Sequence, residues 1–375
     1  MVTSLGISEK NVGNRGSKSE NKISVKEQRV DGSWYDVYSS YLRYTLRSFE
    51  RHSVIKILSN QTNHVRWYTS NTSKHLTVKS NLSPLFITGF SDAECSFSIL
   101  IQANSKYASG WRIKPVFAIG LHKKDKEILE MIKSSLGVGN IHTHGKDSIQ
   151  FRVESLKELL ILISHFDKYT LVSAKQADYL LFKKALDIIL LKEHLSQRGL
   201  LKLVGIKASL NLGLNANLKE AFPNWEKLQE DRPHYVFNGI PSPFWISGFA
   251  SGDSSFNVKI SESPTSLLNK RVQLRFGIGL NIREKALIQC LPAYFDLTVD
   301  PKHVYFNSNS ARFEIVKFSD ITEKVIPFFD KYSIEGKKRL DFMDFKQVAN
   351  IISCKDHLTL EGFDKILEIK NKMNN

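Results

Sequence analysis

The chain contains two copies of one sequence unit, and this duplication limits the folds that it can adopt. Residues 83–101 read SPLFITGFSDAECSFSILI, and residues 242–260, which begin 159 positions later, read SPFWISGFASGDSSFNVKI. The block FDKY occurs at residues 166–169 and again at 329–332, 163 positions later. Two copies are too few for a stacked repeat protein, which needs at least three. We therefore interpret the chain as a pseudo-dimer within one polypeptide.

Each copy has the pattern of an α+β unit with the element order αββαββα. A helix is expected after each Ser-Pro pair, because proline is tolerated in the first helical turn. Two strands follow, in which apolar and polar residues alternate with the period of a half-buried antiparallel strand. A helix that ends at Gly137, two strands near Ile141 and Phe151, and further helices complete the first copy. We predict that helices cover one face of each sheet.

The polar faces of the predicted strands indicate contact with nucleic acid. They carry Ser, Gln, Asn, Arg and Lys, side chains that hydrogen-bond to base edges in the major groove. The alternative, a face that contacts only water, would accept Glu and Asp more freely than these strands do. The residues that we predict to contact DNA are Ser98, Leu100, Gln102, Asn104, Arg112, Lys114, His142, Gln150, Arg152, Asn257, Lys259, Arg271, Gln273 and Arg275.

Charge and composition favour the same class of partner. The net charge is +15, and nucleic acid is the usual partner of so basic a chain. The three cysteines are isolated, so neither a zinc site nor a disulfide framework is expected. No apolar run is long enough to span a membrane. We divide the chain into a mostly disordered basic leader (1–80), a first domain (83–217), a linker (218–240) and a second domain (241–375).

Small residues four positions apart in each predicted first helix indicate unusually close helix packing. Gly248 and Gly252 would form a groove on one helix, and Gly89 and Ala93 would form its counterpart on the other. Ordinary tight packing without chemistry is the alternative. An acid follows each groove, however: Glu94 in the first copy and Asp253 in the second. Two carboxylates brought so close together favour a bound cation, and Mg²⁺ prefers oxygen ligands of this kind.

At these residues the sequence resembles the LAGLIDADG family of homing endonucleases and intron maturases. The nine-residue motif corresponds to ITGFSDAEC at residues 87–95 and to ISGFASGDS at residues 246–254. The resemblance implies a DNA-binding β-saddle, a long asymmetric double-stranded DNA site and hydrolysis of phosphodiester bonds with Mg²⁺. It implies that Glu94 and Asp253 are catalytic and bind the metal, with the carbonyl groups of Ala93 and Gly252 assisting.

The resemblance also implies a cellular setting. It is to single-chain, double-motif members encoded by introns of fungal mitochondria, so we expect a mitochondrial, organelle-encoded monomer. Two alternatives to an active nuclease stay open. A maturase would bind its group I intron RNA and would not need the carboxylates, whereas a degenerate remnant would fold without cleaving.

The motifs depart from the family pattern at three positions. Cys95 and Ser254 replace the glycine that normally follows each acid, and Ser251 replaces the acid that survives as Asp92 in the first copy. If the backbone at Cys95 or Ser254 needed a positive φ, a side chain there would displace the neighbouring carboxylate. These departures put activity, but not fold, in question.

Overall fold

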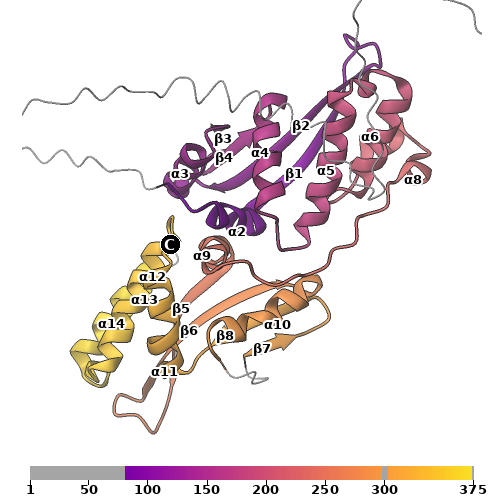
Figure 1. Cartoon of the computed structure of the whole chain (residues 1–375). Helices are drawn as coiled ribbons and strands as arrows, with labels where there is room; N and C mark the ends of the chain where they lie inside the picture. The colour runs from indigo at the N-terminus through magenta and orange to yellow at the C-terminus, as the bar shows by residue number, and fades with distance from the viewer. Residues whose placement is uncertain (1–80, 298–302, 374–375) are drawn as a thin grey trace, which may run out of the picture. The chain divides into compact units, whose positions relative to one another are not determined.

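The computed structural model of the protein describes residues 81–297 and 303–373. The expected leader, residues 1–80, lies outside the described residues. The first half of the described chain contains four strands, with helices before, between and after them along the sequence (Figure 1). Its elements are α2 (Pro84–Glu94), β1 (Cys95–Ala103), β2 (Trp111–His122), η1 (Lys123–Asp125), α3 (Lys126–Leu136), β3 (Asn140–Thr143), β4 (Ser148–Val153), α4 (Leu156–Lys168), α5 (Lys175–Leu190), η2 (Glu193–Leu195), α6 (Gln197–Ser209), α7 (Ala216–Ala221) and α8 (Trp225–Leu228).

The second half repeats this order from α9 onward. Its elements are α9 (Pro243–Asp253), β5 (Ser254–Glu262), β6 (Lys270–Asn281), η3 (Ile282–Glu284), α10 (Lys285–Tyr294), β7 (Val304–Phe306), β8 (Ser310–Ile315), α11 (Phe318–Asp320), the π-helical η4 (Ile321–Val325), α12 (Ile326–Lys331), α13 (Lys338–Ser353), η5 (Asp356–Leu358) and α14 (Leu360–Lys372). The αββαββα prediction is confirmed, and α5–α6 and α13–α14 extend each copy at its carboxyl end. Both Ser-Pro prolines stand in the first turn of their helices.

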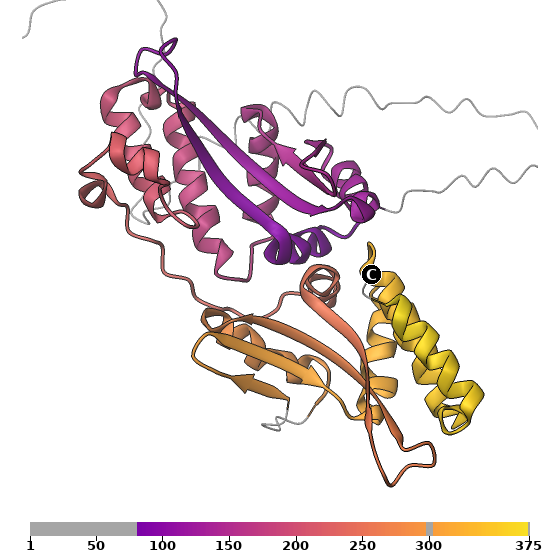
Figure 2. The same ribbon diagram turned by 180° about the vertical axis from the view of Figure 1, so that it is seen from behind.

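Each half forms one four-stranded antiparallel sheet. The strand orders are β1-β2-β4-β3 and β5-β6-β8-β7, so the long hairpin of each copy supplies one edge and the middle of its sheet. Opposite residues in the hairpins repeat at the same offset, for example Phe97 with Phe117 and Phe256 with Phe276. Helices pack against one face of each sheet (Figure 2). The other face carries the polar side chains of the alternating strands.

A cluster of aromatic rings fixes the helices on each sheet. In the first half Phe97 contacts rings from β2, α4 and α5, and all of these side chains are buried. In the second half Phe256 makes the corresponding contacts. The partners are Phe117, Phe166, Tyr179 and Phe182 around Phe97, and Phe276, Phe329, Phe342 and Phe345 around Phe256. The duplication has therefore preserved the core ring by ring, and aromatic burial of this kind dominates core energetics.

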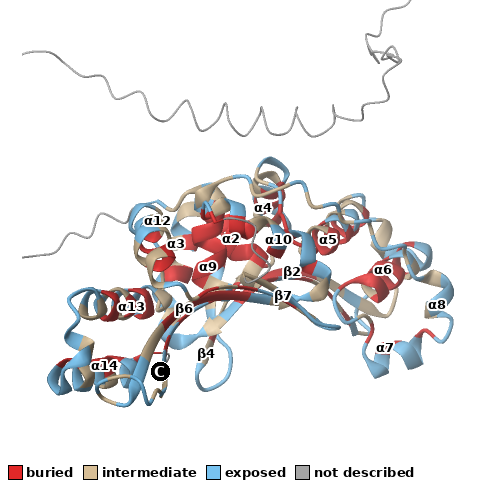
Figure 3. Ribbon diagram, turned by 90° about the horizontal axis from the view of Figure 1, so that it is seen from below, coloured by how far each residue is buried: buried red, intermediate tan, exposed pale blue. Residues whose placement is uncertain are grey.

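The helices α2 and α9 pack against each other and are buried along most of their length (Figure 3). A Cβ atom on Gly89 would lie 2.0 Å from the carbonyl oxygen of Trp245, and one on Gly248 would lie 2.1 Å from that of Phe86. Such distances leave no room for any side chain. The predicted pairing of small residues is confirmed, and the two helices meet backbone to backbone.

The segment that we expected to be a linker contains regular structure at its start. Leu218 and Phe222 are buried in the core of the first half, whereas residues 229–242 form no helix or strand. The division of the chain at residues 218–240 stays a prediction. No helix in the described part of the chain is long and apolar enough to cross a membrane.

The glycine contact predicts the effect of adding one methyl group between the helices. Gly89→Ala should lower the free energy of unfolding by about 3 kcal/mol, because the new carbon overlaps the backbone of α9. Helix propensity alone would raise the free energy of unfolding by about 1 kcal/mol. A decrease would therefore show that the contact between the helices decides the effect. Gly279→Ala, which meets no atom within 4 Å, is the control and should change stability by less than about 0.5 kcal/mol in urea unfolding.

Candidate functional site

The two acids of the repeated motif lie at the carboxyl ends of the paired helices. Glu94 is the last residue of α2, and Asp253 is the last residue of α9. A Cβ atom on Gly252 would lie 2.6 Å from Cβ of Ala93 and 2.9 Å from Cγ of Glu94. The last turn of α9 therefore packs directly on the Glu94 side chain, and the small residues at 93 and 252 allow the two acids to approach.

Burial raises the pKa values of both acids. The pKa of Glu94 is raised first by its burial and then by the charge of Asp253. Burial also raises the pKa of Asp253. The charges of Lys175 and Lys338 lower both values. Two carboxylates and two ammonium groups thus act on one another at the junction of the two halves, where raised carboxyl pKa values favour a cation between the acids.

The two lysines of this cluster were not among the predicted site residues. Lys175 begins α5, and its Nζ donates to the carbonyl oxygen of Ala93 at 2.7 Å. Lys338 begins α13, and its Nζ donates to the carbonyl oxygen of Ser254 at 2.7 Å. The two residues stand 163 positions apart, the offset of the FDKY blocks. An alignment of the two copies through those blocks pairs them, but it pairs other lysines too, such as Lys183 with Lys346.

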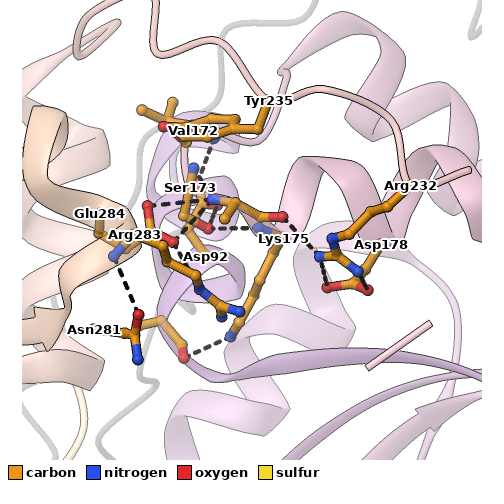
Figure 4. Close-up of polar contacts among 12 residues, drawn as sticks. Asp92, Val172, Ser173, Lys175, Asp178, Arg232, Tyr235, Asn281, Arg283 and Glu284 are labelled. Atoms are coloured by element: carbon orange, nitrogen blue, oxygen red, sulfur yellow. Dashed lines mark hydrogen bonds and ion pairs between the residues drawn. The ribbon is translucent and has the colours of Figure 1, made fainter. Parts of the chain in front are cut away.

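The sixth residue of each motif accepts hydrogen bonds from the loop that precedes the lysine, Lys175 in the first copy and Lys338 in the second. Asp92 is buried and accepts hydrogen bonds from the backbone N–H groups of Val172 and Ser173 at 2.8 and 3.0 Å (Figure 4). Trp245 of α9 donates its indole N–H to the same carboxylate at 2.8 Å. In the second copy Ser251 accepts from the backbone N–H of Glu335 at 3.1 Å. The serine therefore retains the capping role of the acid that it replaces.

The expected disturbance at Cys95 and Ser254 does not occur. The φ angles are −79° at Cys95 and −114° at Ser254, and both residues have the extended backbone with which a strand begins. A glycine is not required at either position, so our concern that a side chain there would displace the carboxylate was wrong. The Cys95 side chain is buried in the core, and the Ser254 hydroxyl donates to the carbonyl oxygen of Ala250 at 2.5 Å.

A cavity lies beside each lysine. One of about 880 Å³ is lined by residues that include Lys175 and Arg283, and one of about 360 Å³ by residues that include Glu94, Lys124 and Lys338. Lys124 and Arg283 are equivalent residues of the two copies. Each cavity thus combines a lysine of one half with a basic residue of the other. Acidic residues line both cavities as well, among them Asp178 and Glu230 in the first and Glu94 and Asp125 in the second.

The predicted DNA-contacting residues of the hairpins lie on the open faces of the two sheets. Ser98, Leu100 and Gln102 oppose Val116, Lys114 and Arg112 across β1 and β2, and the strand neighbours of these residues face the core. The remaining strand positions, on β3–β6, follow the same alternation: His142, Gln150, Arg152, Asn257, Lys259, Arg271, Gln273 and Arg275. Asn104 instead lies in the hairpin turn, where its side chain accepts from the backbone N–H of Lys106.

The sequence analysis missed one carboxylate on the open side of each sheet. Glu154 pairs with Lys114 and Arg152 in the first half. Glu314 pairs with Arg275 and Arg312 at 3.7 and 3.4 Å in the second. Arg275 also donates to the Gln273 side chain. Several basic side chains that we expected to be available to a ligand are thus held in place by an acid, which restricts their rotation.

The donor set at the helix ends fits a divalent cation that keeps part of its water shell. Within the described ranges, no group of three or more His, Cys, Asp and Glu side chains is placed to hold a metal ion. The protein ligands would therefore be the two carboxylates and nearby carbonyl groups, which are oxygen donors. Mg²⁺ is commonly held by one or two carboxylates, with water and substrate phosphate completing its coordination.

The raised pKa values of the pair predict how its charge affects stability. The folded state binds protons more readily than the unfolded state, so the free energy of unfolding falls as the pH rises through the raised pKa values. In metal-free buffer at neutral pH, Glu94→Gln should raise the melting temperature by a few degrees. The gain should vanish at acidic pH, where the unmodified pair is protonated. Asp147→Asn, which affects an exposed ion pair with Lys123, should leave the melting temperature nearly unchanged.

Comparison with known proteins places this geometry in a family. The sequence profile described as LAGLIDADG endonuclease matches residues 87–186 and 246–349. A probable intron-encoded endonuclease 3 of Neurospora crassa is 37% identical over 97% of this chain and 70% of its own length.

Two solved structures share the fold. The crystal structure of the LAGLIDADG meganuclease I-CpaMI bound to uncleaved DNA is 76% identical, with a TM-score of 0.77 over 78% of this chain and 100% of that chain. The I-SmaMI LAGLIDADG homing endonuclease bound to cleaved DNA is 39% identical, with a TM-score of 0.74 over 78% of this chain and 97% of that chain. With both motif helices, both sheets and both acids in place, the chain belongs to the LAGLIDADG endonuclease family.

Proposed function

We propose that this chain is an intron-encoded homing endonuclease that cuts double-stranded DNA with a divalent metal held at Glu94 and Asp253. The observation that carries the proposal is the meeting of these two carboxylates at the ends of α2 and α9, with Lys175 and Lys338 beside them. Such a cluster has no evident structural benefit, since like charges in a partly buried site are costly. Paired carboxylates of this kind can hold the metal ion that assists phosphodiester hydrolysis.

Mg²⁺ is the metal that we propose, and each residue has a separate role. When bound, it would supply an activated water and would stabilise charge on the phosphate oxygens. Glu94 and Asp253 would hold it, assisted by the carbonyl groups of Ala93 and Gly252. The ammonium groups of Lys175 and Lys338, held at the carbonyl oxygens of Ala93 and Ser254, would stabilise negative charge that develops on the phosphate.

The open sheet faces are the proposed DNA-binding surface. I-CpaMI and I-SmaMI are described as DNA-bound, and they share these sheets with the present chain. The polar strand residues project in rows from both hairpins, which suits contact with successive base pairs in the major groove. Because the two halves carry different residues in equivalent positions, the target would be asymmetric. One chain supplies both halves, so a monomer is sufficient.

The cellular setting belongs to the same proposal. Relatives are named for introns: one is an uncharacterized protein in ND4 intron 1 of Podospora anserina, and one an uncharacterized cox1 intron-2 protein of Schizosaccharomyces pombe. We propose that this chain, too, is intron-encoded and made in the mitochondrion. Binding of group I intron RNA would use the basic surface but would leave the paired carboxylates unexplained, so we favour the nuclease.

The proposed metal ligands predict a separation of cleavage from binding. Glu94→Gln and Asp253→Asn should each reduce Mg²⁺-dependent cleavage by at least about 10³-fold, because each loses a metal-binding charge. Affinity for the same DNA in Ca²⁺ should change by less than about tenfold. The substrate is the site that the full chain selects from a randomised double-stranded library. Failure of the unmodified chain to cut any member of that library would contradict the proposed activity.

The open faces predict a test of sequence readout. Arg112 is exposed on β2, opposite Gln102. Arg112→Ala should weaken binding to the selected site by about 1–3 kcal/mol and relax base preference over one or two positions. Arg198→Ala removes a charge that is also exposed, from a helix away from the strands, and should have little effect. An equal loss on random DNA would show that Arg112 contacts only phosphate.

A further inference from the structure

The helices that carry the two lysines are each fixed at their first turn by a carboxylate from the other half of the chain. The backbone N–H of Ala174, just before Lys175, donates to both carboxylate oxygens of Glu284 at 3.0 and 3.3 Å. The backbone N–H of Lys337, just before Lys338, donates to Oδ1 of Asp125 at 2.8 Å. Figure 4 shows the first of these contacts, with Glu284 approaching the start of α5 beside Ser173.

The two contacts are equivalent in the duplication and run in opposite directions. Asp125 ends η1 and Glu284 ends η3, at corresponding positions of the two copies. Glu284 reaches from the second half into the first, and Asp125 reaches from the first half into the second. Each half therefore supports the lysine of the other half. A contact that is reciprocal in this way depends on the pairing of the two halves at α2 and α9.

Neither acid uses its side chain to cap the helix that follows it. Asp125 is the N-cap residue of α3 and Glu284 is the N-cap residue of α10, but neither side chain caps its own helix. Aspartate at an N-cap normally accepts from its own first turn and stabilises the helix by doing so. Here the carboxylates accept instead from the starts of helices in the other half, Glu284 from that of α5 and Asp125 from that of α13. This use of the carboxylates points to a purpose beyond the stability of α3 and α10.

The supported peptides lie next to the lysines, so the contacts control lysine position. The first N–H groups of a helix have no partner within it, and a carboxylate there is a strong acceptor that also faces the positive end of the helix dipole. Glu284 is buried, which restricts its movement further. Without this acceptor the first turn of α5 can fray, and the Nζ of Lys175 loses its fixed place beside Ala93.

We propose that Glu284 and Asp125 are positioning residues that place Lys175 and Lys338 for strand cleavage across the boundary between the halves. The proposal rests on the proposed function. It assigns to the two acids a role through the lysines, without contact with DNA or metal. It also assigns the two acids to different lysines. Removal of one acid should therefore slow mainly the cut of one DNA strand, and removal of the other acid should slow mainly the cut of the opposite strand.

The test compares the two DNA strands in single-turnover cleavage by the full chain. The substrate is the selected double-stranded site, with each strand carrying its own label, in Mg²⁺. Glu284→Ala should slow the cut of one strand by about 10- to 100-fold, the cost of misplacing a group by roughly 1 Å. Asp125→Ala should slow the cut of the opposite strand. Affinity for the site in Ca²⁺ should change by less than about threefold in both variants.

Conservative and control variants separate positioning from general stability. Glu284→Gln keeps an acceptor oxygen and should keep cleavage within about threefold of the unmodified chain. Asp147→Ala makes the same charge change as Asp125→Ala in an exposed ion pair and should cut both strands at the normal rate. Hydrogen exchange of a peptide covering residues 170–178 should be faster in Glu284→Ala, although residue 284 lies in the other half of the chain.

Three results would overturn the inference. They are equal slowing of both strands in each variant, a loss of Ca²⁺-supported affinity as large as the loss of rate, and unmodified rates in both alanine variants. All three presuppose that the unmodified chain cleaves its site. If it does not cleave, the proposed function fails first, and the hydrogen-exchange comparison still tests whether Glu284 holds the start of α5.

Discussion

The approach of α2 to α9 at backbone distance determines where every group of the site lies. The carbonyl oxygens of Phe86 and Trp245 occupy the space that a side chain would need at Gly248 and Gly89. This contact brings the ends of both helices together, and with them Glu94 and Asp253. The same contact sets the distance between the two sheets' supporting loops, so that Glu284 reaches Ala174 and Asp125 reaches Lys337. Packing and chemistry therefore depend on the same small residues.

Most of the fold follows from the sequence because its signals are local or repeated. The alternation around Phe97 and Phe256 gives the strands, the Ser-Pro pairs give the helix starts, and the constant offset gives the duplication. The pairing of α2 with α9 follows from two glycines and two acids at matching positions. These features predict the fold without any knowledge of long-range contacts, because the same sequence signals occur in both halves.

The rest of the site could not be predicted because it depends on contacts between distant segments. In the sequence Asp125 is an unremarked acid before a helix, and the natural prediction is that it caps that helix. Its partner Lys337 lies 212 positions away. Lys175 and Lys338 are two lysines among many until the loops before them are placed. Glu154 lies one residue beyond a short strand, so the alternation that identified the open face did not include it.

The replacement of an acid by Ser251 has a physical explanation in the charge of the junction. Burial is the main cause of the raised pKa values of Glu94 and Glu284, and neighbouring carboxylates raise them further: Asp253 and then Asp125 raise that of Glu94, and Asp92 raises that of Glu284. Asp92 accepts from the backbone N–H of Val172, an uncharged residue. Ser251 accepts from the backbone N–H at the equivalent position of the second copy, which is the acidic Glu335. An aspartate at 251 would add a second negative charge beside that glutamate. The hydroxyl supplies the acceptor that the loop needs without that charge, so each half keeps one acid and one neutral partner at this point. In the second copy the acid of this contacting pair is therefore Glu335 and the neutral residue is Ser251, the reverse of Val172 and Asp92 in the first copy. The carboxylates of Glu94 and Asp253 are not affected by this exchange.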